Sequence, residues 1–339
     1  MKDFTDLNPT EEASQVLSQA EYARVEELCL TMDADVDSWF SSSVACCNFC
    51  IDEYLVAWPN AYRHDEGLFQ RNSMNFSFFY EGSKRVRDIF AKDEFQRLLP
   101  HVACPRCLRS IGATLYAYEL PFSVPEAWEA KQRHLAERAV NTPFLLLREP
   151  FANEIYDNLR IACSDVKSTR LSVDLFRGRR CGQRPNDKDF YPPSRENTRE
   201  GRYNHAGIPV LYLATARLTC WRECRRPSSN FYVCRVSIDK AMKIVDLAES
   251  DDLDPGLQAL IFSSLMSAPS SDEGWYQPQY VLTRFVADCV KANGIDGIIY
   301  PSVRCGKGNN LAILDTKNFE TWLRISGIQE YQEGAMYMG

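Results

Sequence analysis

Five side chains in the second half of the chain have the clearest potential for chemistry. They are Arg177, Arg202, Tyr212, Glu223 and Ser302. A guanidinium group can hold a phosphate through two parallel hydrogen bonds, and a carboxylate can stabilise positive charge that develops during a reaction. Tyrosine and serine hydroxyls can orient either partner. Taken singly, the tyrosine would more often be a core residue and the glutamate a solvated one.

The segment from Arg177 to Asn204 is basic in an acidic chain. It holds eight basic and four acidic residues, whereas the whole chain has a net charge of -7. Most of its basic residues are arginines, whose planar guanidinium groups suit bidentate phosphate binding. The segment is therefore either an anion-binding site or a solvated polar loop. It runs into GRYNHAG (residues 201–207), where the glycines predict a turn that Asn204 can fix by hydrogen bonding to the backbone.

The order of these motifs resembles that of the RES domain family, which is named after its arginine, glutamate and serine. The resemblance rests on FR at 176–177, GRYN at 201–204, YLA at 212–214, Glu223 and GIIYPS at 297–302. It covers a little under half of the chain. One departure is Gly178, because family members often have an aromatic or other large residue directly after the first arginine.

The resemblance implies an ADP-ribosyltransferase-like fold and an enzyme that degrades NAD, typically as the toxin of a bacterial toxin–antitoxin pair. Cleavage of the nicotinamide–ribose bond passes through an oxocarbenium-like transition state, so we expect Glu223 to stabilise charge or orient the attacking group. Ser302 would hydrogen-bond a ribose hydroxyl or that glutamate, and Tyr212 would stack on or orient the nicotinamide or its ribose. Arg177 and Arg202 would hold the diphosphate.

Asn204 joins these two arginines among the expected NAD-binding residues. NAD would be a substrate and not a hydride carrier, because no GxGxxG motif lies between a strand and a helix. Water, phosphate and a protein side chain are all compatible with the sequence as the attacking group. The leading hypothesis is an NAD glycohydrolase or phosphorylase that acts as a toxin or defence effector. The alternatives are an ADP-ribosyltransferase that modifies a macromolecule and a catalytically inactive, zinc-containing interaction module.

Two pairs of cysteines in the first half have the spacing of metal-binding knuckles. Cys47 and Cys50 form one C-x2-C pair, and Cys104 and Cys107 form the other. Four thiolates supplied by two tight turns suit a tetrahedral structural zinc ion. The pairs are much farther apart than the roughly 15–20 residues of the usual pattern, so buried free thiols and redox chemistry stay as alternatives.

The N-terminal region resembles the HEPN/RES N-terminal type of extension through CCNFCIDEYL and CPRC. Some HEPN domains are ribonucleases with an arginine and a histidine that are separated by four to six intervening residues. The nearest candidate, Arg97 with His101, has three intervening residues that include a proline, so we predict no nuclease activity. A recognition or regulatory role is expected instead.

The composition is that of an ordinary globular protein. Hydrophobic residues make up 45% and charged residues 25% of the 339 residues, and the sequence pI is about 5.3. The acidic balance argues against a nucleic-acid partner. No secretory signal or membrane-length apolar run is found, so we expect a cytoplasmic protein with no membrane association, and thirteen cysteines kept as thiols or metal ligands. Expected partners are NAD and an antitoxin or regulatory protein.

The distribution of apolar residues predicts an α+β protein with two domains. Residues 1–150 would form a mostly helical, cysteine-containing domain, residues 151–325 a compact mixed α/β RES domain, and residues 326–339 a tail. The boundary is placed where Pro143 and Pro150 bracket FLLLRE. A strand is expected at 173–177, before the polar loop, and others at 210–214, 231–238, 243–247, 297–300 and 311–314. Helices are expected at 11–40, 125–140, 151–164 and 279–293.

Overall fold

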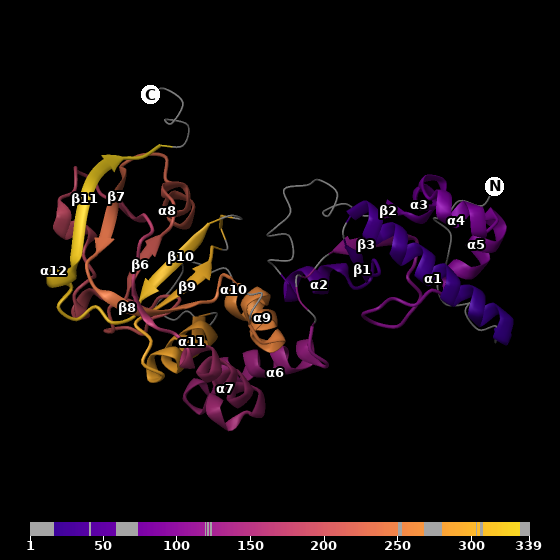
Figure 1. The fold of residues 1–339 in the computed structure, drawn as a ribbon, viewed down its shortest axis with the longest axis horizontal. Coiled ribbons are helices and arrows are strands. Elements are labelled where there is room, and N and C mark those ends of the chain that lie inside the picture. Colours follow the sequence, from indigo (N-terminus) through magenta and orange to yellow (C-terminus); the bar gives the residue numbers. More distant parts are fainter. Residues whose placement is uncertain are drawn as a thin grey trace. The chain divides into compact units, whose positions relative to one another are not determined.

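The computed structural model describes residues 17–40, 42–58, 74–118, 120, 122, 124–249, 253–267, 280–302, 304–305 and 308–332. Two units, Met1–Pro121 and Phe122–Gly339, each have their own internal contacts. The predicted fold class is confirmed, because the first unit is mostly helical and the second contains a mixed sheet (Figure 1).

The first unit combines short helices with a small antiparallel sheet in the order β1-β3-β2. Its elements are α1 (Gln19–Phe40), β1 (Ser43–Cys46), α2 (Ile51–Ala57), β2 (Met74–Asn75), α3 (Phe76–Gly82), α4 (Lys84–Ile89), α5 (Lys92–Leu98), η3 (Leu99–His101) and β3 (Thr114–Tyr118). Asn75 and Ser83 start α3 and α4, since each side-chain oxygen accepts a backbone N–H at 2.8 Å. We predicted no strand here, because strands of two to five residues are too short for apolar alternation to be visible.

The second unit is built around an eight-stranded sheet in the order β11-β7-β5-β6-β10-β9-β8-β4. The strands are β4 (Ser168–Arg170), β5 (Leu175–Arg180), β6 (Leu211–Ala214), β7 (Phe231–Ile238), β8 (Ala241–Asp246), β9 (Gly297–Pro301), β10 (Asn309–Ile313) and β11 (Leu323–Glu330). Neighbouring strands are antiparallel except for β8 and β9. Leu175, Leu211, Val236 and Ile313 belong to one buried cluster that holds the sheet together.

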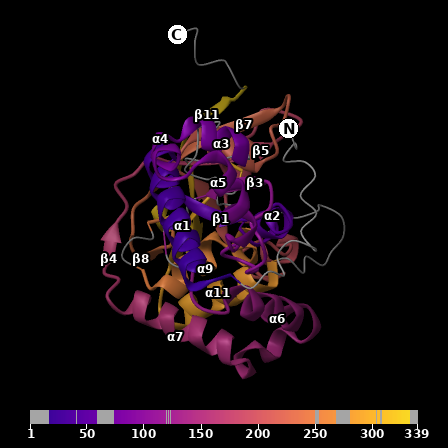
Figure 2. The same cartoon turned by 90° about the vertical axis from the view of Figure 1, so that its right-hand side faces the viewer.

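Helices α6 and α7 pack against α11, and α7 also contacts α9 (Figure 2). The helices of this unit are α6 (Trp128–Asn141), α7 (Pro150–Ser164), α8 (Arg217–Glu223), α9 (Pro255–Phe262), α10 (Ser264–Ser267), α11 (Val281–Ala292) and α12 (Phe319–Trp322), with short 3-10 turns η4 (Pro143–Arg148), η5 (Asp187–Phe190) and η6 (Arg195–Asn197). In α7 the buried side chains recur every four residues, at Phe151, Ile155, Leu159 and Cys163. No helix within the described ranges is long and apolar enough to span a membrane.

The division between the units differs from the expected domain boundary at residue 150. It falls at Pro121, because α6 and α7 pack on helices of the second unit. The expected tail from residue 326 also differs, since β11 continues to Glu330 and pairs with β7. Prolines mark where a chain turns, but tertiary packing decides to which core a helix belongs.

Strand β5 extends farther than the expected strand at 173–177. Arg177, Gly178 and Arg179 all pair with β7, opposite Cys234, Val233 and Tyr232. The first part of the expected polar loop is therefore a sheet strand. Its three closely spaced arginines gave no local strand signal, and the backbone hydrogen bonds to β7 override that polarity.

Candidate active site

A pocket of about 440 Å³ lies in the second unit, with lining residues on β5, β6, β9, β10 and α8. Arg177, Arg202, Tyr212 and Glu223 all line it, and the buried Ser302 contacts Glu223. The structure thus brings together five residues that are up to 125 positions apart in the sequence. The lining includes five arginines and two glutamates, so its charge suits an anionic ligand.

Glu223, the last residue of α8, is held through one carboxylate oxygen. Its Oε1 accepts hydrogen bonds from Ser302 Oγ at 2.6 Å and Asn310 Nδ2 at 2.8 Å. The Ser302 hydroxyl accepts the backbone N–H groups of Arg304 and Cys305, so its own proton is directed at the carboxylate. Ser302 and Asn310 are 2% and 4% exposed. Because Oε1 is fully engaged, Oε2 is available to the pocket, with Arg304 Nε 3.9 Å away.

Arg177 is a buried cation without an acidic partner. Only 7% of the residue is exposed, its Nη1 donates to the carbonyl oxygen of Tyr212 at 3.0 Å, and its Nε has no partner. No carboxylate in the described part of the chain forms an ion pair with it. Burial and the neighbouring charge of Arg179 lower the pKa of Arg177 to about 9. A buried, unpaired charge is costly, so an anion bound in the pocket would complete this site.

The GRYN turn is closed by the hydroxyl group of Tyr212. This hydroxyl donates to Asn204 Oδ1 and accepts the backbone N–H of Tyr203, each at 2.9 Å. The Asn204 amide donates in turn to the backbone carbonyls of Arg199 and His205. Burial raises the pKa of Tyr212, which keeps the hydroxyl protonated. Asn204 therefore supports the turn from a buried position outside the pocket lining, and the Tyr212 ring is what borders the pocket.

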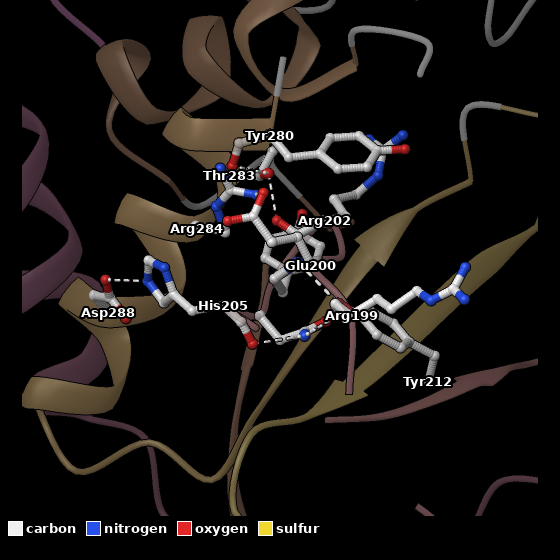
Figure 3. Close-up of polar contacts among 11 residues, drawn as sticks. Arg199, Glu200, Arg202, His205, Tyr212, Tyr280, Thr283, Arg284 and Asp288 are labelled. Atoms are coloured by element: carbon white, nitrogen blue, oxygen red, sulfur yellow. Dashed lines mark hydrogen bonds and ion pairs between the residues drawn. The ribbon is translucent and has the colours of Figure 1, made fainter. Parts of the chain in front are cut away.

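Arg202 is anchored on the segment around α10 and α11. Its Nη1 donates to the carbonyl oxygen of Met266 at 2.6 Å. Its guanidinium group lies beside the Tyr280 ring (Figure 3), with the guanidinium carbon 5.3 Å from the ring centre. Both Arg202 and Tyr280 line the pocket. A cation over an aromatic face is attracted to it, so Tyr280 fixes the plane of this guanidinium group.

Helix α11 holds the backbone that carries Arg202. The Thr283 hydroxyl donates to the Arg202 carbonyl oxygen, and Arg284 Nη1 pairs with Glu200 Oε2 at 3.0 Å (Figure 3). Arg284 is 4% exposed, so this ion pair is largely removed from solvent. His205 Nε2 contacts Asp288 Oδ2 at 2.8 Å. These contacts fix both ends of the turn to one helix.

Comparison with known families identifies the domain that contains this pocket. Residues 176–331 match the model of the RES domain. The second unit contains a RES domain. Members of the RES family are generally NAD-processing enzymes. The resemblance of the first unit to the HEPN/RES N-terminal type stays a prediction.

A search of solved structures found a similar chain in the crystal structure of the M. tuberculosis MbcT–MbcA toxin–antitoxin complex. The identity is 12% and the TM-score 0.37, over 52% of this chain and 93% of that chain. A search of curated protein sequences gave no match.

The pocket lining also includes residues that were not among the predicted site residues. Arg179, Tyr280 and Asn310 are three of them. Asn310 comes directly before the apolar run LAIL (residues 311–314), and a polar residue beside a strand that is expected to be buried was a usable signal. The sequence signal for Arg179 was its position two residues after Arg177, which puts both side chains on one face if the segment is a strand. Tyr280 gave no sequence signal.

In the first unit, the four cysteines of the two C-x2-C pairs converge. All four Sγ atoms lie within 4.8 Å of one another, with Cys47 at 3.6 Å from Cys50 and 3.8 Å from Cys107. The backbone N–H groups of Cys47 and Arg106 donate to Cys104 Sγ. Although burial opposes it, a backbone N–H and the neighbouring thiols lower the pKa of Cys107 to about 7. This donor set is suited to a metal ion that prefers thiolates.

Proposed function

We propose that the RES domain cleaves the bond between nicotinamide and ribose in NAD. The observation that carries the proposal is one pocket that combines an oriented carboxylate with an unneutralised, buried guanidinium group. Glu223 is tied through Oε1 to Ser302 and Asn310, and Arg177 has no acidic partner among the described residues. NAD offers the complementary groups, because its diphosphate is anionic and its nicotinamide ribose becomes cationic in the reaction.

The chemistry asks little of the protein beyond binding and charge stabilisation. As the bond between ribose C1′ and the nicotinamide nitrogen breaks, both electrons move to that nitrogen, and nicotinamide leaves as a neutral molecule. No acid has to protonate it. Positive charge develops on the ribose, where Glu223 Oε2 can stabilise it. An attacking group then forms the new bond to C1′, and when that group is water its proton passes to Glu223 or to solvent.

Two further residues have supporting roles in this proposal. Ser302 holds Glu223, because its hydroxyl proton points to Oε1 and its oxygen is occupied by two backbone N–H groups. It therefore acts on the carboxylate and not on a ribose hydroxyl. The Tyr212 hydroxyl is likewise engaged, so its ring face is the part that would pack against the nicotinamide or its ribose.

Incubation of the full chain with NAD tests the reaction and its alternatives. Release of nicotinamide with free ADP-ribose supports hydrolysis, and release with a phosphorylated ADP-ribose supports phosphorolysis. Transfer of labelled ADP-ribose to protein or nucleic acid supports a transferase. Glu223→Gln keeps the side-chain size but removes the charge, and we expect at least a hundredfold loss of nicotinamide release. No release by the wild-type protein, together with normal NAD levels in cells that express it, would refute both enzymatic functions.

An NAD-degrading enzyme harms the cell that makes it, so the proposal includes a toxin or defence role and a restraining antitoxin or regulatory protein. Growth and NAD content of bacteria expressing the wild-type chain or Glu223→Gln test this role. We expect loss of NAD and arrested growth with the wild-type chain alone. Arrest with Glu223→Gln as well would show that toxicity does not come from the reaction.

We also propose that Cys47, Cys50, Cys104 and Cys107 hold a structural zinc ion. Zn–S bonds of about 2.3 Å place the corners of a tetrahedron about 3.8 Å apart, close to the separations between these sulfur atoms. The N–H groups directed at Cys104 would stabilise a metal-bound thiolate. Metal analysis of protein purified without chelators should give one zinc per chain, and Cys104→Ser should lose it. Zinc well below one per chain, unchanged by Cys104→Ser, would exclude the site.

A further inference from the structure

Arg177 and Arg179 point to the same face of strand β5. Side chains two residues apart on a strand lie on one side of it, and both arginines line the pocket. A side chain at Gly178 would point to the opposite face, where a Cβ atom would collide with the ring of Phe231. Because Gly178 has no side chain, the Phe231 ring can pack closely against β5 on that face. On the other face, the strand directs two neighbouring guanidinium groups into the pocket.

Neither of these two guanidinium groups is neutralised by the protein. The Nε atoms of both are buried without a hydrogen-bond partner, and neither arginine pairs with a carboxylate anywhere in the described ranges. Arg179 is also the charged neighbour that, after burial, most lowers the pKa of Arg177. Two like charges kept together in a pocket need a counter-anion, and this one must come from a ligand.

Arg202 is in a different situation, although it lines the same pocket. It is already engaged by the Met266 carbonyl and the Tyr280 ring, and Glu223 is one of the charges that act on it. Arg202 therefore belongs to the part of the pocket around Glu223. The pair on β5 is the part left to bind an anionic group away from the reacting bond.

We propose that Arg177 and Arg179 together form a diphosphate-binding site that accepts nucleoside diphosphates with or without nicotinamide. Two adjacent guanidinium groups can each bind one phosphoryl group through paired hydrogen bonds, whereas a monophosphate would engage only one of them fully. The site deepens the proposed function, since it lies in the pocket assigned to NAD. The resemblance to the RES family implied that Arg177 and Arg202 hold the diphosphate, whereas in this proposal Arg179 takes the place of Arg202.

This site has a consequence for the reaction. ADP-ribose keeps the diphosphate after nicotinamide has left, so the product and ADP both compete with NAD for the pocket. Diphosphate-containing nucleotides would then slow the enzyme, and inhibition by ADP should be competitive with NAD.

Calorimetric titration of the full chain with ADP and with AMP tests the site. We expect ADP to bind at least about tenfold more tightly than AMP, as one additional charge-assisted pair would give. Arg179→Gln should reduce this ratio to near one. Arg180→Gln is the matched control, because Arg180 is the exposed next residue on the opposite face of β5 and should keep the ratio. Equal affinity for ADP and AMP in the wild-type protein, or an unchanged ratio in Arg179→Gln of normal melting temperature, would overturn the proposal.

The titration separates this site from the proposed reaction, because it needs no turnover. Glu223→Gln, which should not cleave NAD, should keep the preference for ADP. A wild-type protein that prefers ADP but releases no nicotinamide would leave the diphosphate site standing and remove the NAD-cleaving function. Nicotinamide release without any preference for ADP would support the NAD-cleaving function and remove the diphosphate site.

Discussion

Asn310 offers the sharpest test of how the site is organised, because it contacts the glutamate and sits deep in the sheet. Its Nδ2 donates to Glu223 Oε1 at 2.8 Å, and 4% of the residue is exposed. Asn310→Ala removes one of the two hydrogen bonds that hold the carboxylate and leaves Ser302 alone. The carboxylate then gains freedom to rotate away from the orientation in which Oε2 faces the reacting ribose.

The size of the effect follows from the type of hydrogen bond. A hydrogen bond to a charged group contributes about 1.5–3 kcal/mol, and the Glu223 side chain is 29% exposed, which favours the lower end. About 1.5 kcal/mol corresponds to a roughly tenfold fall in kcat. Because Asn310 acts through Glu223, the KM for NAD should stay within about twofold. The assay is nicotinamide release at several NAD concentrations.

Two controls make this prediction decisive. Asn309→Ala changes the preceding residue on β10, whose side chain lies on the other face of the sheet, and kcat should be nearly unchanged. In a Glu223→Gln background, Asn310→Ala should add little to the loss, since the two residues act as one unit. An unchanged kcat in Asn310→Ala, or a rise in KM alone, would show that the hydrogen bond does not orient the carboxylate for catalysis.

Two other predictions concern the charged groups around the pocket. Arg177→Met removes an unpaired buried cation whose pKa is lower in the folded than in the unfolded protein. The ligand-free variant should therefore melt at the same temperature as the wild type or a few degrees higher, and the rise in melting temperature on adding NAD should disappear. A lower melting temperature of the ligand-free variant would contradict this. Arg284→Leu leaves Glu200 without its buried partner and should cost about 3 kcal/mol of unfolding free energy, measured by denaturant titration, whereas a loss below about 1 kcal/mol would show that the pair is solvated.

Much of the fold could be predicted from the sequence, because these elements depend on local residue patterns. The predicted strand at 231–238 and the predicted helix at 151–164 agree with β7 and α7 to within a residue. Both carry regular apolar spacing with clear ends. The three short strands of the first unit were not predicted, because their pairing and not their residue pattern defines them. The same reason applies to the extension of β5 through Arg180.

The residues of the candidate site could likewise be predicted from the sequence, whereas their contacts could not. Motif order was enough to single out Arg177, Arg202, Tyr212, Glu223 and Ser302, and to pair the cysteines at 47, 50, 104 and 107. Their contacts were not in the sequence. Asn204 and the Tyr212 hydroxyl, expected near the substrate, form a hydrogen bond with each other and shape a turn. Asn204 is buried, so its polar groups must find partners within the protein.

The sequence by itself therefore determined which chemical groups this protein can use, since residue type and motif order are properties of the chain. Tertiary structure alone decided which of these groups remain unpaired in the pocket. Ser302 and Asn310 take up one oxygen of Glu223, whereas nothing in the described residues neutralises Arg177 and Arg179. Whether a polar group is satisfied depends on neighbours that are distant in sequence, and the sheet brings those neighbours together.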